Sequence, residues 1–355
     1  MTGGAGTDTY TVDDAGDVVV EAANAGNDLV QARIATYTLT ANVEDLTFLG
    51  TGNFTGTGND LSNTIRGVAG NDTLSGGNGN DSLFGNDGND TLNGGAGVDQ
   101  LRGENGDDTL NGGDGDDNLQ GALGADIVNG DAGNDVLNGN TGNDVLTGGA
   151  GNDTLNGGVD TDTAVFAGPI DNYVLSGNTT ALSVTDTAGN GGTDSLTGIE
   201  ILQIGGVNYT VVAGTSGVDA ALNGGAGSQA LFGFGASDTL NAGTGNDLLI
   251  GGGGNDTMNG GDGDDFIFQN STGDGQDFID GGIGSDTYIL TGDASTETFR
   301  IYARAAWLAV AGNTAAQLNA NTVIVITLNG TNAISILAQL DNIEEIKINS
   351  LLTTA

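Results

Sequence analysis

Eleven aspartates follow one another at intervals of nine residues in this chain. An aliphatic residue comes two positions after nearly every one of them, and a glycine comes two positions before those from 72 to 153. A typical unit reads Gly-Gly-Asn-Gly-Asn-Asp-Ser-Leu-Phe over residues 76–84. An acid, a glycine and an aliphatic residue held in phase this long predict a short structural unit that is repeated and stacked as a solenoid.

The nine-residue unit is expected to divide into a six-residue glycine-rich turn and a three-residue strand whose aliphatic residue points inward. Two units then form one 18-residue coil, so Asp72 stacks on Asp90 and Asp81 stacks on Asp99 in two separate columns. Neighbouring coils lie about 4.8 Å apart. At an effective dielectric constant of about 20, two carboxylates at that spacing repel by roughly 3 kcal/mol. The stack is therefore not expected to close without a cation.

Calcium fits this pattern of oxygen donors. It takes about six to eight oxygen ligands, including backbone carbonyls, and glycines allow a turn to point its carbonyls at an ion. Zinc would require Cys or His, and the chain contains neither. Magnesium prefers a rigid octahedron with retained waters. A single Gly-x-Gly-x-Asp is usually an ordinary turn, but eleven in phase favour a calcium-binding array.

The predicted ligands are aspartate side chains and the carbonyls of the glycines two positions before them. The aspartates are Asp72, Asp81, Asp90, Asp99, Asp108, Asp117, Asp126, Asp135, Asp144, Asp153, Asp162, Asp238, Asp247, Asp256, Asp265, Asp277, Asp286 and Asp8. The glycines are Gly70, Gly79, Gly88, Gly97, Gly106, Gly115, Gly124, Gly133, Gly142, Gly151, Gly245, Gly254 and Gly263. For Asp8 and Asp28 an ordinary turn is as good an interpretation as a ligand, and for Asp60 it is the better one. Glu44, Glu200 and Glu344 are expected to close the hydrogen bonds of a strand rather than to bind metal.

The repeats predict five segments. Residues 1–54 form a partial roll turn with a β segment, 55–166 the main roll, 167–213 a β-rich cap, 214–290 a second roll, and 291–355 a C-terminal β-rich cap with a candidate secretion signal. Asn63 takes the place of the acid where the main roll begins, and Gln229 does so in the second roll. The phase of the second roll shifts by three residues before Asp277. Strands are expected at 181–184, 209–212 and 299–302.

Composition excludes several functions. The formal charge of −41 excludes nucleic acid as a natural partner and argues against binding to anionic lipid. The sequence has no apolar run of about 18 residues, so no transmembrane segment is predicted. The N-terminus lacks the basic and apolar regions of a signal peptide. With no His or Cys, the chain has no serine triad, no Cys–His pair and no zinc helix, so we predict that it is not an enzyme.

These motifs resemble the RTX family of secreted bacterial proteins, which carry hemolysin-type calcium-binding repeats. The resemblance is dense over 58–166 and 236–290 and thin elsewhere. It implies a parallel β-roll with calcium held between successive turns. It also implies export through a type I channel by an uncleaved C-terminal signal, followed by folding in extracellular calcium. The tail Ser350–Ala355 is apolar and rich in hydroxyl groups, which fits this route.

The predicted function is that of a non-catalytic, secreted calcium-binding structural protein: a surface-layer, matrix or filament component, or an adhesin scaffold. The alternative is a calcium-dependent secretion and folding module of a larger RTX exoenzyme or toxin. Residues 6–10 match residues 284–288, where the second roll finishes. This match predicts head-to-tail self-association through the N-terminal stub, with truncation of a longer protein as the competing interpretation.

Overall fold

The computed structural model describes residues 1–23, 25–189, 191–270, 275–292, 299–303, 324–328, 336–343 and 345–350. These residues form β-strands stacked as parallel coils, with one short 3₁₀ helix, η1 (Ile170–Asn172), and no α-helix in the described ranges. The predicted all-β parallel roll is therefore confirmed. The chain divides into two compact units, the first made of residues 1–166 and 189–200 and the second of residues 167–188 and 201–355.

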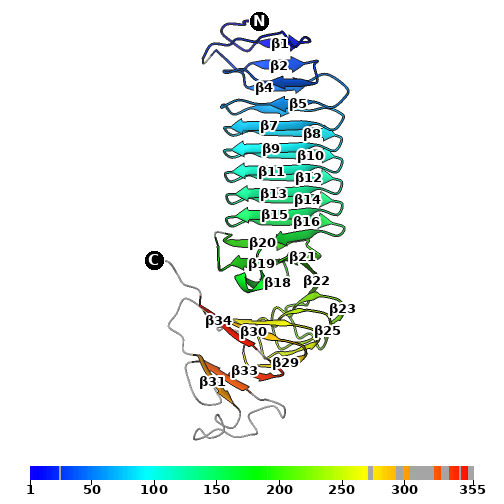
Figure 1. Ribbon diagram of the computed structural model, residues 1–355, viewed down its shortest axis with the longest axis vertical. Helices are drawn as coiled ribbons and strands as arrows, with labels where there is room; N and C mark the ends of the chain where they lie inside the picture. Colours follow the sequence, from blue (N-terminus) through cyan, green and yellow to red (C-terminus); the bar gives the residue numbers. More distant parts are fainter. Residues whose placement is uncertain are drawn as a thin grey trace. The chain divides into compact units, whose positions relative to one another are not determined.

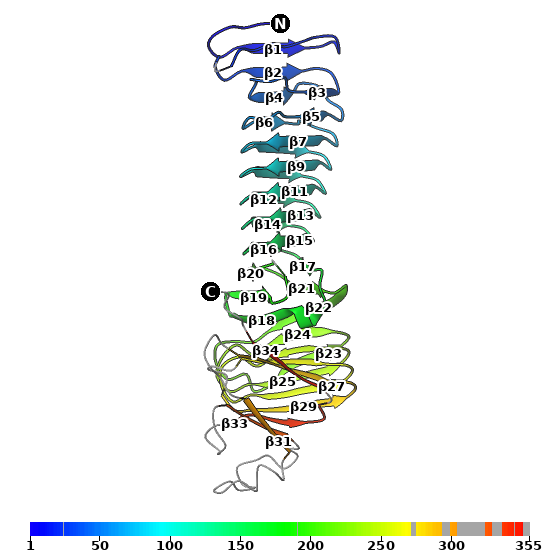
Figure 2. The same cartoon turned by 60° about the vertical axis from the view of Figure 1, so that its left-hand side comes forward.

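The first unit consists of two sheets, and each coil of the main array contributes one strand to each (Figures 1 and 2). The strands of the first sheet, in order across it, are β1 (Thr9–Val12), β2 (Leu29–Ala32), β4 (Asp45–Phe48), β6 (Thr64–Arg66), β8 (Ser82–Asp87), β10 (Gln100–Asn105), β12 (Asn118–Leu123), β14 (Val136–Thr141), β16 (Thr154–Val159) and β20 (Thr193–Thr197). Those of the second sheet are β3 (Thr36–Thr38), β5 (Thr55–Thr57), β7 (Thr73–Asn78), β9 (Thr91–Ala96), β11 (Thr109–Asp114), β13 (Ile127–Ala132), β15 (Val145–Ala150) and β17 (Thr163–Phe166).

The register between coils places each aliphatic residue on its counterpart 18 residues away. Leu101 pairs with Leu119 in the first sheet, and Leu110 pairs with Val128 in the second. The aliphatic residues of the array, from Leu74 to Leu155, have no exposed surface. Burial of one such side chain stabilises the fold by about 1.5–3 kcal/mol. The inward position predicted for the aliphatic residue is confirmed, and it builds a continuous core from identical small contributions.

The strands are longer than the sequence predicts. Each strand of the array covers six residues, as in Thr73–Asn78, where Leu74 and Gly76 face inward. The prediction of a three-residue strand was wrong because the glycine-rich backbone also pairs with the next coil. Gly77 pairs with Gly95, and the Gly79 N–H donates to the Ala96 carbonyl at 2.8 Å. A backbone that lacks side chains still has to satisfy its hydrogen bonds, and the neighbouring coil does so.

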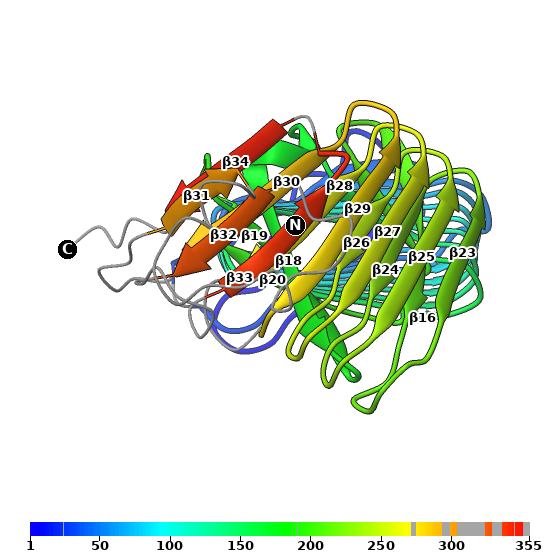
Figure 3. The same cartoon turned by 90° about the horizontal axis from the view of Figure 1, so that it is seen from below.

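The second unit also contains two stacks of strands, which are parallel except for the antiparallel pairs β21–β22, β33–β32 and β32–β31 (Figure 3). One runs β21 (Ile201–Ile204), β22 (Val207–Ala213), β24 (Gln229–Phe232), β26 (Leu248–Ile250), β28 (Phe266–Asn270), β30 (Thr287–Gly292) and β34 (Glu345–Ser350). The other runs β23 (Leu222–Ala226), β25 (Thr239–Thr244), β27 (Thr257–Asp262), β29 (Asp277–Ile283), β33 (Ile336–Asp341), β32 (Ile324–Leu328) and β31 (Phe299–Ala303). β18 (Tyr173–Asn178) and β19 (Ala181–Asp186) form an antiparallel hairpin.

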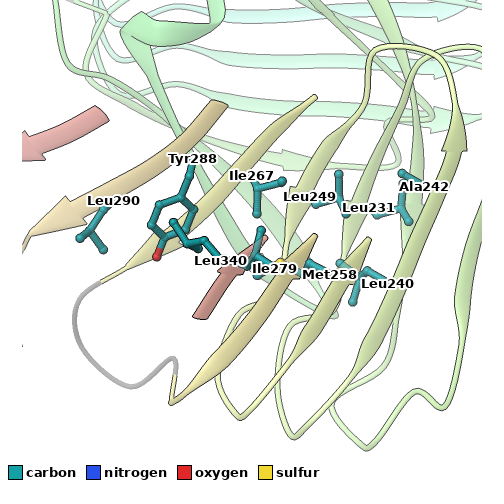
Figure 4. Packing of buried hydrophobic residues seen from close by; sticks show 10 residues of the cluster. All are labelled: Leu231, Leu240, Ala242, Leu249, Met258, Ile267, Ile279, Tyr288, Leu290 and Leu340. Carbon is teal, nitrogen blue, oxygen red and sulfur yellow. The ribbon is translucent and has the colours of Figure 1, made fainter. Parts of the chain in front are cut away.

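The core of the second unit lies between its two stacks. Leu231, Leu249 and Ile267 come from one stack and face Leu240 and Met258 of the other (Figure 4). The strands predicted at 181–184, 209–212 and 299–302 are present as β19, β22 and β31. Glu344 and most of the C-terminal tail, residues 351–355, lie outside the described residues. Among the described residues, we find no helix that is both apolar enough and long enough to cross a membrane.

Candidate calcium-binding columns

The array aspartates form two ladders of hydrogen bonds that run from coil to coil. In each ladder, the backbone N–H of one aspartate donates to Oδ1 of the aspartate 18 residues later. The Asp90 N–H reaches Asp108 at 2.7 Å in one column, and the Asp99 N–H reaches Asp117 at 2.7 Å in the other. The array aspartates are at most 2% exposed. The predicted stacking in two columns is confirmed, and the ladder holds each carboxylate in a fixed orientation.

The second oxygen of these carboxylates, Oδ2, is buried and has no hydrogen-bond partner among the described residues. Burying an ionised carboxylate with an unsatisfied oxygen is costly, so such an atom indicates a missing positive partner. The array aspartates in this state are Asp81, Asp90, Asp99, Asp108, Asp117, Asp126, Asp135, Asp144, Asp153, Asp162, Asp238, Asp247, Asp256 and Asp265.

The electrostatics of the columns show the same need for a cation. Burial, together with the charges of Asp99 and Asp135 in the neighbouring coils, raises the pKa of Asp117 to about 7. Asp108 and Asp265 also reach a pKa of about 7, mainly through burial. Desolvation and like charges both disfavour the ionised form. The closed stack therefore strongly favours either protons or a bound cation on these side chains.

The glycine five positions before each aspartate of the main array, here called the first glycine, lies against Oδ2, whereas Ala242 takes this position before Asp247. A Cβ atom at Gly76 would lie 2.1 Å from Asp81 Oδ2 and 2.7 Å from the carbonyl oxygen of Gly94 in the next coil. The same relation holds at Gly112, where the corresponding distances to Asp117 Oδ2 and the Gly130 carbonyl oxygen are 2.4 and 2.7 Å. Any side chain here would fill the space beside the carboxylate. The first-glycine carbonyls are thus candidate ligands that the sequence analysis did not name.

The glycine two positions before each aspartate has a different role in the stack. Gly106 has a φ of 128°, and a Cβ there would lie 1.8 Å from the Gly88 carbonyl oxygen of the previous coil. The predicted glycines at this position therefore permit close stacking of one coil on the next. Their carbonyl oxygens pack on the equivalent glycines of the following coil, whereas the first-glycine carbonyls lie beside Oδ2.

The residue four positions before each aspartate determines whether Oδ2 has a partner. In the array this residue has a positive φ even when it is not glycine, as at Glu104 (78°), Ala122 (90°) and Asp131 (71°). Where the backbone is left-handed here, Oδ2 of the following aspartate is without a partner. Side chains other than Gly and Asn adopt positive φ at a cost, so the stack imposes this conformation on the turn.

Asp72 is the exception, and it stands first in its column. It follows Val68, which is not left-handed, and the Val68 N–H donates to Asp72 Oδ2 at 3.1 Å. Asp219 repeats this arrangement with Thr215, whose N–H donates to its Oδ2 at 2.8 Å. β-branched residues resist positive φ. In these two turns a backbone N–H donates to Oδ2 of the aspartate. The sequence analysis predicted Asp72 as a ligand equivalent to the other array aspartates and did not foresee this hydrogen bond.

The second roll keeps the same ladder through its irregularities. The Gln229 N–H donates to Asp247 Oδ1 at 2.7 Å, so Gln229 occupies the acid position as predicted. After the phase shift, the Asp256 N–H reaches Asp277 at 2.8 Å and the Asp265 N–H reaches Asp286 at 2.9 Å, each across 21 residues. Three extra residues change the length of the coil but leave the column intact.

The columns extend further than the nine-residue repeat. The Asp153 N–H donates to Asp194 Oδ1 at 2.9 Å across 41 residues, and the Asp162 N–H donates to Glu200 at 2.9 Å. Near the N-terminus, the Asp8 N–H donates to Asp28, and the Asp28 N–H donates to Glu44, both at 2.8 Å. Glu44 and Glu200 close strand hydrogen bonds, as predicted. Asp194 and Asp219 were missed, and the Asp-x-Leu of residues 194–196 was the available signal.

The residues present fit calcium on three grounds. Apart from Asp72, each aspartate of the main array offers an Oδ2 without a partner. In this array a glycine leaves the space beside this oxygen open, and all the donors are oxygen atoms. The aspartate Oδ2 atoms and the first-glycine carbonyls would hold the ion. When bound, it would supply the positive charge that neutralises the stacked carboxylates.

A comparison with sequence models of protein families identifies the same repeats. The sequence model of the RTX calcium-binding nonapeptide repeat matches residues 57–92, 93–128, 129–164, 232–267 and 271–294. No curated protein matches the sequence significantly. A crystal structure of the extracellular lipase LipA from Serratia marcescens is similar at 18% identity with a TM-score of 0.28, covering 67% of this chain and 37% of the lipase chain. Over the residues that the sequence model matches, the chain carries RTX calcium-binding nonapeptide repeats.

Proposed function

We propose that this chain is a secreted, non-catalytic structural protein whose folding and assembly are driven by calcium. The observation that carries the proposal is the pair of aspartate columns in which Oδ1 is held by the backbone and Oδ2 is buried without a partner. A surface-layer, matrix or filament component, or an adhesin scaffold, would use a stack of calcium-bridged coils of this kind.

Calcium is proposed as the ligand that links binding to folding. The unfolded chain has no columns, so a cation that binds between stacked coils stabilises only the folded state. Extracellular calcium modules bind with dissociation constants of about 10⁻⁴–10⁻³ M. A protein that is exported unfolded, as is typical of RTX proteins, would meet such concentrations only outside the cell. This supports secretion as its route.

The burial of the acids supports a structural rather than a catalytic role. A catalytic carboxylate has to reach its substrate. The array aspartates are at most 2% exposed, and their backbone ladder fixes them inside the turns. The paired carboxylates that a glycosidase would require are here engaged in stacking.

Circular dichroism of the full chain tests the calcium-driven fold. We expect a largely unfolded spectrum in chelator and a β spectrum after addition of millimolar calcium. Magnesium at the same concentration serves as the control and should restore little structure. A β spectrum that is unchanged by chelator would contradict the proposal.

A further inference from the structure

Three carboxylates converge near the N-terminus, outside the main array. One oxygen each from Asp8, Glu21 and Asp28 lies within 4.8 Å of the other two. Within the described residues, this is the single group of three or more acidic side chains at such distances. The coil from Asp8 to Asp28 spans 20 residues instead of 18, and Glu21 lies in the longer loop between β1 and β2.

Two of these side chains carry buried oxygens that lack partners. Asp28 has no exposed surface, and its Oδ2 and that of Asp8 have no hydrogen-bond partner among the described residues. Glu21 is only 7% exposed, and its Oε1 accepts the Gly3 N–H at 3.2 Å. The phenolic oxygen of Tyr10 is also buried without a partner. These unsatisfied atoms are a second, independent sign of a missing ligand.

Gly3 brings these groups together. A Cβ atom there would lie 2.2 Å from Asp8 Oδ2 and 2.3 Å from the Tyr10 hydroxyl oxygen. Gly3 therefore has the same position relative to Asp8 as the first glycine Gly76 has relative to Asp81. Because it has no side chain, the space beside the Asp8 carboxylate stays open. Glu21 adds a carboxylate that the nine-residue motif does not contain.

We propose that Asp8, Glu21 and Asp28 form a calcium site that fills at lower free calcium than the sites of the main array. The reason is the charge of the donor set, because affinity for calcium rises with the number of carboxylates and the rigidity of the site. Calcium bound at this site would stabilise the N-terminal coil at calcium concentrations that do not yet fill the sites of the array. This inference rests on the calcium-binding role proposed above.

Calcium titration of the full chain by calorimetry is the test. We expect one site that binds at least tenfold more tightly than the remaining sites. Glu21→Gln keeps an oxygen for the Gly3 N–H but removes the third charge, so the tight site should weaken to the affinity of the others. The matched control is Asp13→Asn, which removes a charge from an exposed residue of the same coil and should leave the tight site unchanged.

A second measurement covers the case in which Glu21→Gln fails to fold. Terbium bound at this site is close to Tyr10, so its emission should be excited through that ring, and Tyr10→Phe should abolish the emission of the first equivalent bound. Tyr10→Phe removes a hydroxyl that has no partner, so the fold should persist.

A single affinity class in the wild-type chain, equal binding by Glu21→Gln and Asp13→Asn, or unchanged terbium emission in Tyr10→Phe would overturn the inference. In each of these cases the array would still bind calcium. A wild-type chain that binds no calcium at all would instead overturn the proposed function.

Discussion

At the scale of single residues, Asp72 and Asp90 occupy the same position of the motif but differ in their bonding. Asp72 accepts the Val68 N–H on Oδ2, whereas Oδ2 of Asp90 has no partner. The residue four positions before Asp90 is Asn86, with a φ of 81°. The β-branched Val68 therefore accounts for the difference between the two carboxylates. Asp72 accepts a backbone N–H at the end of its column, whereas Asp90 keeps an oxygen that is available to an ion.

This difference predicts unequal effects of two identical substitutions. Each substitution removes one acceptor from the ladder. Asp72→Ala removes the Oδ1 that accepts the Phe54 N–H, and Asp90→Ala removes the Oδ1 that accepts the Asp72 N–H. Only Asp90→Ala removes an available Oδ2, so it should reduce the number of bound calcium ions by at least one, and Asp72→Ala should leave that number unchanged. Metal analysis of the dialysed proteins measures it. An equal loss in both variants would contradict the role given to Val68.

The inward aliphatic residues allow a prediction about folding. Leu119→Asp places a charge in the core, where an uncompensated buried charge costs on the order of 3–5 kcal/mol. Thr154→Asp adds the same charge to an exposed strand position. We expect Leu119→Asp to raise the calcium midpoint of folding severalfold and Thr154→Asp to change it little. Circular dichroism during calcium titration compares them, and equal midpoints would mean that Leu119 does not face inward.

At the scale of the element, the column of aspartates behaves as a unit because each member contacts its neighbours. Two ionised neighbours raise the pKa of Asp117, and the coil above supplies the oxygen that accepts its N–H. Coils interact mainly with the next coil, as in other repeat proteins. Protonation of the column and binding of calcium therefore compete for the same oxygens.

The raised pKa values predict that acid partly replaces calcium. Burial and neighbouring charges raise the pKa of Asp117 from the usual 3.8 to about 7 and that of Asp135 to about 6 when the roll closes. A group with a raised pKa in the folded state stabilises that state at low pH, and this contribution is lost as pH rises through about 7. In chelator, β structure should therefore be greater at about pH 5 than at about pH 8.

Circular dichroism in chelator across this range tests the prediction, and about pH 5 stays above the isoelectric point of 4.1. Asp117→Asn, which cannot ionise, is the matched variant and should reduce the dependence on pH. In the presence of calcium we expect the opposite dependence on pH, because protons compete with the ion for the carboxylates. The calcium concentration at the midpoint of folding should therefore rise as pH falls. A chelated chain with the same spectrum at both pH values would contradict this account.

At the scale of the molecule, the N-terminal edge of the first sheet is the feature that bears on assembly. β1 is the outermost strand of its sheet among the described residues, and it pairs with β2 on one side. An exposed strand edge is a template for another strand. Head-to-tail contacts that do not close into a ring propagate into a filament.

We therefore predict that the chain forms calcium-dependent, extended assemblies through β1. Deleting residues 1–12 removes this strand and should return the protein to monomers, while chelator should do the same to the full chain. Light scattering and electron microscopy at millimolar calcium measure the outcome. Monodisperse full-length monomers in calcium, with no change after the deletion, would exclude this mode of assembly.

The sequence alone determined the repeated coil, the two columns and the inward aliphatic residue. These features follow from a strict period, so the environment of Asp108 or Leu110 is the same in every coil and can be inferred from one unit. The sequence also predicted that Asn63 and Gln229 occupy positions of the aspartate columns, because both residues keep the phase of the repeat. The boundaries of the five predicted segments remain predictions.

Only the tertiary structure decided which carboxylate oxygens are satisfied and where the columns end. Asp194 joins its column from 41 residues away, and Glu21 reaches Asp8 and Asp28 from a longer loop. Such contacts do not keep the period of 18, so the Asp-x-Leu of residues 194–196 marks the motif but not the coil that Asp194 joins. The bond from Val68 to Asp72 depends on the handedness of one turn, which the nine-residue period does not specify. Periodicity specifies what recurs, whereas the ends of the roll depend on contacts between residues distant in sequence.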